Sequence, residues 1–155
     1  MGRGNSGIGG SKISAGGSRV LPPLPSNVIG GQLKIFHDTM NDPAARGSND
    51  VRFTSGIQDE VAFGRTYTVN GSYEILTPAG IQRRTGEITA FNGRLFGVEQ
   101  TQSGFNTTDL RTGLAIGQRD QSKYAVWNTI LVFNDGKSRM AQRLQSAETT
   151  FKQIH

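Results

Sequence analysis

The fold is decided by one stretch of the sequence, Glu87-Ile88-Thr89-Ala90-Phe91-Asn92-Gly93-Arg94-Leu95-Phe96-Gly97-Val98. Two runs rich in β-forming residues flank the dipeptide Asn92-Gly93. Asn-Gly supplies the two positive φ angles that a type I′ turn requires, and the twist of that turn matches the twist of the flanking strands. The sequence therefore predicts a β-hairpin over residues 87–98.

The pattern extends to both sides of this hairpin. Upstream, residues 66–76 repeat it around a second dipeptide, Asn70-Gly71. Downstream, residues 105–116 continue it through a turn at Arg111-Thr112. Successive hairpins of this kind predict an antiparallel β-meander.

Shorter elements are expected before the meander. Residues 32–39 alternate apolar and polar side chains, which predicts a strand. Residues 40–50 contain Asn, Asp, Pro and Gly and therefore predict a loop. Ser55 is a suitable N-cap for a short helix that stops at Gly64.

The period of the apolar residues changes towards the C-terminus. Two stripes with helical spacing are separated by Asn134-Asp135-Gly136 and consist of Tyr124, Trp127, Ile130 and Leu131, then Met140, Leu144, Ala147 and Phe151. They predict a helical hairpin. The expected fold class is therefore α+β, an antiparallel β-meander with two Asn-Gly hairpins that is covered on one face by a C-terminal helical hairpin.

The chain of 155 residues divides into an arm and one domain. Residues 1–31 are rich in Gly, Ser and Pro and predict a flexible arm, while residues 32–155 form the single α+β domain. The arm contributes Arg3, Lys12 and Arg19 without an acidic residue, so it accounts for three of the five net positive charges. A basic arm can bind phosphate backbones or acidic protein surfaces.

The composition excludes several classes of function. The chain has no Cys and two His, which argues against a disulfide framework, a thiolate or zinc site and a cysteine nucleophile. No apolar run approaches the roughly 18 residues that a membrane-spanning helix needs, so we expect no membrane partner. The carboxylates show no spacing typical of glycosidase or metal chemistry, and we expect neither a metal nor a cofactor.

His37 is the candidate catalytic residue, because it is the one histidine inside the chain and ends a predicted strand. With Thr54-Ser55 on the next element and a later glutamate, it resembles the ADP-ribosyltransferase superfamily. That resemblance implies that His37 holds a nucleotide ribose, although the chain has no paired tyrosines at the spacing of the histidine-type branch. The alternative is a structural histidine that caps the strand end through hydrogen bonds.

Basic residues near aromatic residues form the second candidate site. Arg83, Arg84 and Arg94 bracket the 87–98 hairpin, near Phe91 and Phe96. Sheets that bind single-stranded nucleic acid combine such charges with exposed rings on which bases stack. The alternative is that both rings belong to the core and the arginines are solvated.

Two segments are similar to proteins of bacteriophages and mobile elements. The opening Met1-Gly2-Arg3-Gly4-Asn5-Ser6 looks like the leaders of phage-encoded proteins. Residues 86–151, which include the run Thr112-Gly113-Leu114-Ala115-Ile116, resemble small accessory domains of polyvalent phage and conjugative-element proteins. The resemblance implies a role early in infection and carries over no catalytic residue.

We therefore expect a non-enzymatic bacteriophage or mobile-element protein that binds a macromolecular partner. It is either an inhibitor of a host protein, such as an anti-defence factor in the host cytoplasm, or a virion component with an extended N-terminal arm. Candidate binding residues are Arg3, Lys12, Arg19, Arg83, Arg84 and Arg94. The alternatives are a nucleic-acid-binding protein and an enzyme that uses His37, and a homo-oligomer stays open.

Overall fold

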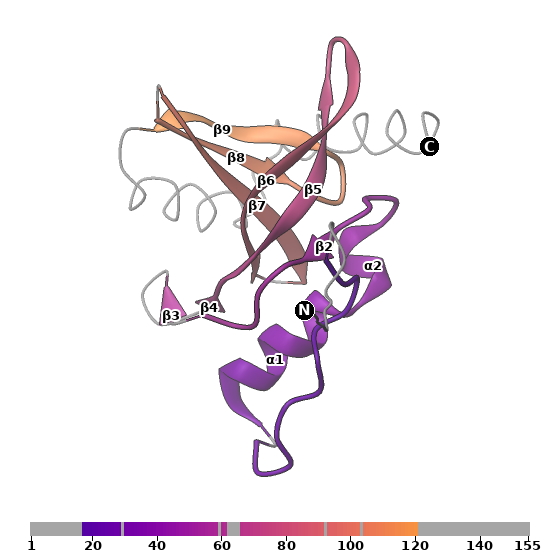
Figure 1. The fold of residues 1–155 in the computed structure, drawn as a ribbon, viewed down its shortest axis with the longest axis vertical. Helices are drawn as coiled ribbons and strands as arrows, with labels where there is room; N and C mark the ends of the chain where they lie inside the picture. The colour runs from indigo at the N-terminus through magenta and orange to yellow at the C-terminus, as the bar shows by residue number, and fades with distance from the viewer. Residues whose placement is uncertain are drawn as a thin grey trace, which may run out of the picture.

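The computed structural model describes residues 17–120, apart from residues 29, 59, 62–65, 92 and 103. The described part of the chain is mostly β (Figure 1). Its elements, in chain order, are α1 (Gly31–Met40), α2 (Pro43–Arg46), β2 (Arg52–Phe53), β3 (Glu60–Val61), β4 (Thr66–Tyr67), β5 (Val69–Thr77), β6 (Gly80–Phe91), β7 (Arg94–Thr101), β8 (Gly104–Asp109) and β9 (Leu114–Asp120).

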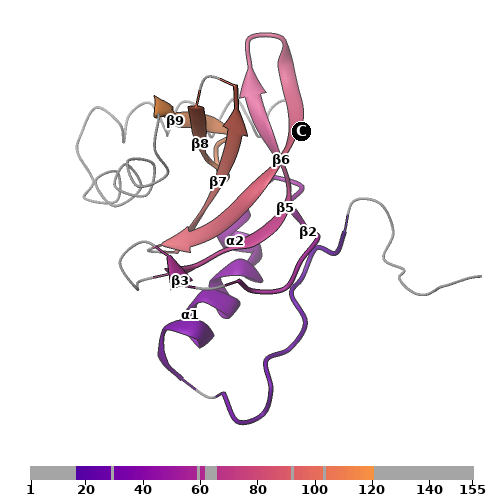
Figure 2. The ribbon, with the colours of Figure 1, turned by 60° about the vertical axis from the view of Figure 1, so that its left-hand side comes forward.

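Six of the strands form one antiparallel sheet in the order β2-β5-β6-β7-β8-β9, and β3 pairs with β4 separately. The sheet is strongly twisted, so β8 and β9 cross over the end of β5 rather than lying flat beside it (Figures 1 and 2). The curl brings distant strands together, because the Leu76 amide at the end of β5 donates to the Gly113 carbonyl in the β8–β9 turn at 2.8 Å. The sheet thus has a concave face that can enclose a core.

The hairpin that decides the fold is confirmed. β6 and β7 pair from Glu87 opposite Val98 to Phe91 opposite Arg94, and Gly93 has a φ of 77°. The β8–β9 hairpin is confirmed as well, with Gly113 at a φ of 71°.

The predicted Asn70-Gly71 hairpin is wrong, because β5 continues through both residues. A Cβ at Gly71 would collide with the carbonyl oxygen of Arg52, so this glycine lets β2 approach β5 closely. The chain turns instead between Thr77 and Gly80, where Gly80 has a φ of 109° and the Thr77 hydroxyl donates to the Gly80 carbonyl at 2.7 Å.

The predicted strand over residues 32–39 is also wrong, because these residues belong to α1. Phe36 and Met40 lie four residues apart on one face of α1 and are both buried, and the Phe36 ring lies 5.7 Å from the ring of Tyr67. Lys34 and Asp38 form an ion pair of 2.6 Å at the same spacing. The alternation that suggested a strand also fits one buried stripe of a helix.

Two further local predictions need correction. The predicted loop over residues 40–50 contains α2, whose N-cap Asp42 accepts a hydrogen bond of 3.0 Å from the Ala44 amide. The helix predicted from Ser55 is absent from the described part of its range. The Ser55 hydroxyl accepts a hydrogen bond from the Asn70 amide instead of capping a helix, and the predicted stop at Gly64 lies outside the described residues.

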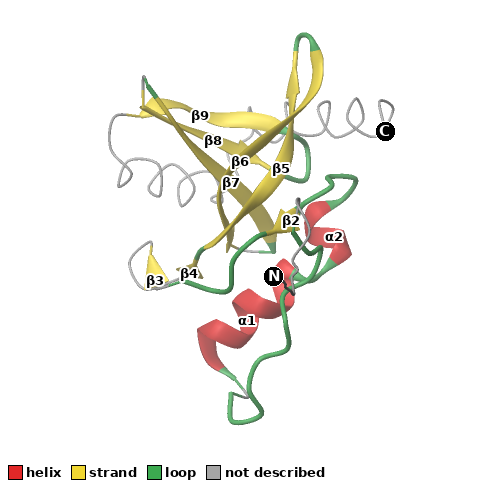
Figure 3. Cartoon of the chain, in the orientation of Figure 1, coloured by secondary structure: helices red, strands yellow, loops and turns green. Residues whose placement is uncertain are grey.

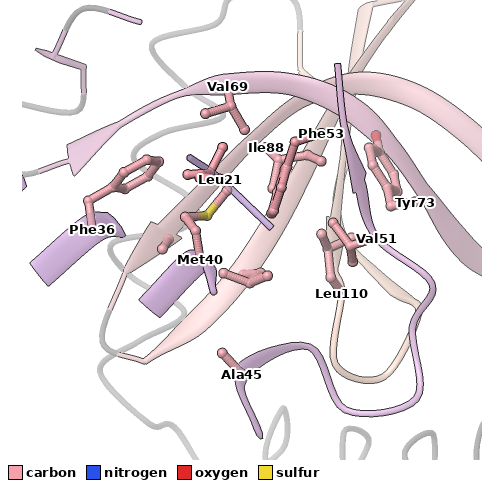
Figure 4. Packing of buried hydrophobic residues seen from close by; sticks show 12 residues of the cluster. Leu21, Phe36, Met40, Ala45, Val51, Phe53, Val69, Tyr73, Ile88 and Leu110 are labelled. Carbon is pink, nitrogen blue, oxygen red and sulfur yellow. The ribbon is translucent and has the colours of Figure 1, made fainter. Parts of the chain in front are cut away.

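The core lies between the concave face of the sheet, the two helices and the segment that precedes them (Figures 3 and 4). Figure 4 shows Phe36 and Met40 of α1 on the side of the core that faces Val69 and Ile88 of the sheet, with Ala45 of α2 farther from these two residues. The buried residues of the core are Leu21, Phe36, Met40, Ala45, Val51, Phe53, Val69, Tyr73, Ile88, Ala90, Leu95 and Leu110.

The predicted α+β fold class is therefore wrong. The described chain is mostly β, and the helices that cover its sheet come from residues 31–46, where we predicted a strand and a loop. The predicted C-terminal helical hairpin falls within residues 121–155, outside the described residues. None of the helices in the described chain is both long enough and apolar enough to span a membrane.

Candidate partner-binding site

Three arginines converge on one carboxylate at the β2 edge of the sheet. Asp50, which lies just before β2, contacts Arg52 Nη2 at 2.8 Å, Arg83 Nη2 at 2.8 Å and Arg19 Nε at 3.1 Å. We call these four residues the Asp50 cluster. The sequence analysis named Arg19 and Arg83 as candidate binding residues. It did not name the other two members, Asp50 and Arg52.

The strand register explains why these residues meet. Arg52 of β2 lies opposite Ser72 of β5, and the Ser72 hydroxyl accepts a hydrogen bond of 2.9 Å from Arg83 Nη1 of β6. Arg19 arrives from the other side, because Ser18 forms a bridge with Phe53 that extends the sheet by one residue. Backbone pairing therefore brings side chains from three distant segments to one carboxylate.

The cluster has a surplus of positive charge. Three guanidinium groups face Asp50, and the nearby Glu74 carboxylate accepts a hydrogen bond of 3.1 Å from the Asp50 amide. Counting both carboxylates still leaves one net positive charge. The Asp50 side chain is 24% exposed, whereas those of Arg52, Arg83 and Arg19 are 36%, 37% and 66% exposed. The carboxylate is thus the inner group and the guanidinium groups face solvent.

The arginines keep Asp50 ionised. Partial burial works to raise the pKa of Asp50, but the hydrogen bonds from Arg52 and the charges of Arg52, Arg19 and Arg83 together outweigh it, so this pKa lies below its usual 3.8. Arg19 approaches Asp50 through Nε at 3.1 Å, and its side chain is 66% exposed. The cluster can therefore donate further hydrogen bonds to an anion.

The other predicted cations lie elsewhere. Arg84 pairs with Glu99 at 3.4 Å, and Arg94 holds the buried Asp109 with two hydrogen bonds of 3.0 and 2.8 Å. Arg3 and Lys12 lie outside the described residues. The sequence therefore identified cationic residues without indicating which of them share a surface.

The aromatic residues near these arginines do not form a stacking surface. Phe96 is fully buried, and Phe91 is partly buried at the end of β6, where it faces a groove beside α1. Bases need an exposed ring face for stacking. The interpretation of Phe96 as a buried residue is the one that agrees with the structure.

His37 holds the N-terminal segment against α1. Its Nε2 lies 2.9 Å from the Pro22 carbonyl. One turn further, the Asn41 side chain accepts a hydrogen bond of 2.7 Å from the Leu21 amide and donates one of 3.3 Å to the Leu21 carbonyl. Since His37 lies in a helix, the strand end on which its catalytic interpretation rested does not exist.

Within the described residues, no His, Asp and Glu side chains gather in a group that could hold a metal.

An apolar groove lies beside the Asp50 cluster. One wall is residues 18–23, which we call the strap, and the other is residues 53–56 at the end of β2. The groove has a volume of about 480 Å³, and its apolar lining consists of Val20, Leu21, Pro22, Pro23 and Phe53. Val20 is 52% exposed, which is high for a branched apolar side chain.

The sequence contained one signal for the two residues that we missed. Asp50 and Arg52 are two positions apart, so in an extended segment their side chains point to the same face. Arg52 accordingly binds both oxygens of Asp50 through Nε, at 3.3 and 3.1 Å. Because we predicted a loop over residues 40–50, we did not expect Asp50 to share a face with Arg52 of β2.

No family model, no curated protein and no solved structure matches the chain.

Proposed function

We propose that this protein is a non-enzymatic bacteriophage or mobile-element protein that binds an acidic surface of a protein partner through the Asp50 cluster. The origin rests on the resemblance of residues 86–151 to accessory domains of polyvalent proteins. The binding rests on the cluster. The partner is a host protein that is inhibited in the host cytoplasm, or a neighbouring subunit in a virion.

One observation carries the proposal, namely three guanidinium groups on a single carboxylate at an exposed sheet edge. Arginine is enriched at protein interfaces, because its planar group donates to carboxylates in a fixed geometry and is weakly hydrated. Asp50 holds the side chains of Arg52 and Arg83 in place before a partner arrives. Binding therefore costs less side-chain entropy than it would with free arginines.

A protein partner fits better than a nucleic acid. Binding along a phosphate backbone uses several cations, each of which neutralises a phosphate and displaces a counterion of the nucleic acid. Arg84 and Arg94, two of the cations considered for that role, pair with Glu99 and Asp109 outside the Asp50 cluster. Phe96 is buried, so within the described residues it offers no ring face for the stacking that this alternative needs.

The proposal assigns no reaction to the protein. His37 was the residue considered for nucleotide chemistry, and its ring is occupied by the Pro22 carbonyl and the Asn41 side chain. Its role in this proposal is to position the strap.

The experiment is affinity capture from nuclease-treated bacterial lysate with the full chain as bait. We expect a captured protein with an acidic surface whose yield falls at high salt, because exposed charges are screened. The double variant Arg52→Gln/Arg83→Gln should lose it. Arg84→Gln is the matched control, since Arg84 lies next to Arg83 and pairs with Glu99 outside the cluster.

Two results would contradict the proposal. One is capture from untreated lysate that is absent from nuclease-treated lysate, which would favour the nucleic-acid alternative. The other is a captured protein that the double variant and the control retain equally, which would place the binding surface elsewhere.

A further inference from the structure

The strap groove has a preformed shape. Pro22 and Pro23 supply part of one wall, and proline rings restrict the backbone of that wall. Leu21 is 4% exposed and anchors the strap in the core. His37 and Asn41 fix the strap from the side of α1. A ligand would therefore meet a groove that needs little ordering on binding.

The opposite wall is equally well fixed. The Phe53 amide donates to the Ser18 carbonyl at 2.6 Å, and the Ser18 amide donates to the Phe53 carbonyl at 2.9 Å. These two hydrogen bonds hold the end of β2 against the strap. The Ser55 hydroxyl accepts a hydrogen bond of 2.8 Å from the Asn70 amide, which holds this wall against β5. Each wall is therefore attached to the sheet as well as to the other wall.

Two arginines of the Asp50 cluster are chain neighbours of residues that line the groove. Arg19 lies between the groove residues Ser18 and Val20, and Arg52 directly precedes the groove residue Phe53. Consecutive Cα atoms are about 3.8 Å apart, so a few residues of an extended ligand span both features. The combination of an apolar groove with adjacent cations is complementary to an apolar residue flanked by carboxylates.

We propose that the strap groove receives an apolar side chain from an extended acidic segment of the protein partner, whose carboxylates bind Arg19 and Arg52. The inference rests on the proposed function, because it takes the acidic partner of the Asp50 cluster as given. It adds that the partner is recognised by an apolar anchor as well as by charge. Charge then steers the encounter, and the anchor supplies selectivity.

The test uses dye-labelled peptides and the full chain, with binding measured by fluorescence anisotropy. One probe is a short glutamate peptide with a central tryptophan, and the second has serine in place of the tryptophan. Burying a large apolar side chain contributes about 1.5–3 kcal/mol, so we expect the tryptophan peptide to bind at least about tenfold tighter.

A variant that fills the groove separates the anchor from the charges. Gly56→Leu adds a side chain at a groove residue where a Cβ meets no atom within 4 Å, so the fold should tolerate it. We expect it to abolish the preference for the tryptophan peptide and to leave binding of the serine peptide unchanged. Gly30→Leu is the matched control, because Gly30 is equally open and does not line the groove.

Each remaining outcome overturns at least one of the two proposals. Equal binding of both peptides to the unaltered chain overturns the groove proposal, and the cluster keeps its proposed function if Arg52→Gln weakens both. Binding that Arg52→Gln leaves unchanged overturns both proposals. If a neutral tryptophan peptide binds as tightly as the acidic one, the proposal that the occupant is acidic is wrong. If single-stranded DNA of equal charge displaces the peptide, the proposal that the occupant is an acidic protein segment is wrong.

Discussion

Two sites in this protein are built from arginine and aspartate, and they differ in burial and in the ratio of charges. At Asp109, a carboxylate with no exposed surface meets one arginine through two hydrogen bonds, and Thr112 donates a third of 2.7 Å. At Asp50, a partly exposed carboxylate meets three arginines. At the first site the carboxylate is enclosed in the fold, while at the second three guanidinium groups reach the surface. The same chemistry thus serves the fold at one site and is suited to a partner at the other.

Asn49 joins the two sites. Its Nδ2 donates to the Glu74 carbonyl at 2.9 Å and to the Leu110 carbonyl at 2.8 Å, and its Oδ1 accepts from the Glu74 amide at 2.9 Å. Asn49 precedes Asp50 in the chain, and Leu110 follows Asp109. One buried amide therefore fixes the distance between the exposed cluster and the closed pair.

The largest effect should come from breaking the closed pair. Arg94→Met leaves the Asp109 carboxylate buried without its cation, and we expect the free energy of unfolding to fall by about 3–5 kcal/mol. Urea denaturation measures it. Arg84→Met is the control, since Glu99 is 26% exposed and the loss there should stay below about 1 kcal/mol. Equal losses for the two variants would remove the distinction between a closed and an open site.

The second effect concerns the connection between the sites. Asn49→Ala leaves two carbonyls and one amide without this partner, and we expect a loss of about 2–3 kcal/mol in the free energy of unfolding. A double-mutant cycle with Arg94→Met should deviate from additivity, because Leu110 and Asp109 are neighbours. Additive losses would mean that Asn49 does not couple the two sites.

The third effect is a pH dependence at the open site. The pKa of Asp50 is lowered in the folded protein, so its contribution to stability is present above the unfolded value of 3.8 and is lost as the pH falls through the folded pKa. Asp50→Asn should lower Tm near neutral pH, where this contribution is fully present. Below about pH 4 its Tm should fall less steeply than that of the unaltered chain. Parallel curves of Tm against pH for the two proteins would contradict this assignment.

The smallest effect should separate the sites by their response to salt. Arg83→Gln removes one exposed contact of Asp50 and should lower the free energy of unfolding by about 0.5 kcal/mol at low salt. At about 1 M salt the difference should disappear, because exposed charges are screened. The loss in Arg94→Met should persist at the same salt concentration. A loss in Arg83→Gln that salt does not reduce would show that Asp50 is less open than its exposure indicates.

The local predictions succeeded where one short signal decides the backbone. The chain reverses between β6 and β7 as predicted, with Gly93 at a positive φ, because both flanking strands find partners in the meander. Asn70-Gly71 did not turn, since Gly71 is needed for the close approach of β2. Residues 32–39 formed a helix because their apolar face is buried against the sheet, which their own alternation cannot reveal. The same limit applies to the site, where the sequence identified Arg19 and Arg83 but not their shared carboxylate.

The sequence by itself determined the β6–β7 and β8–β9 hairpins and the surplus of basic residues, because turn chemistry and composition are local properties. Only the tertiary structure decided that Arg19, Arg52 and Arg83 meet at Asp50, whereas Arg94 is used inside the fold. The physical reason is that strand register and the curl of the sheet, both set by long-range backbone pairing, determine which distant side chains share a surface.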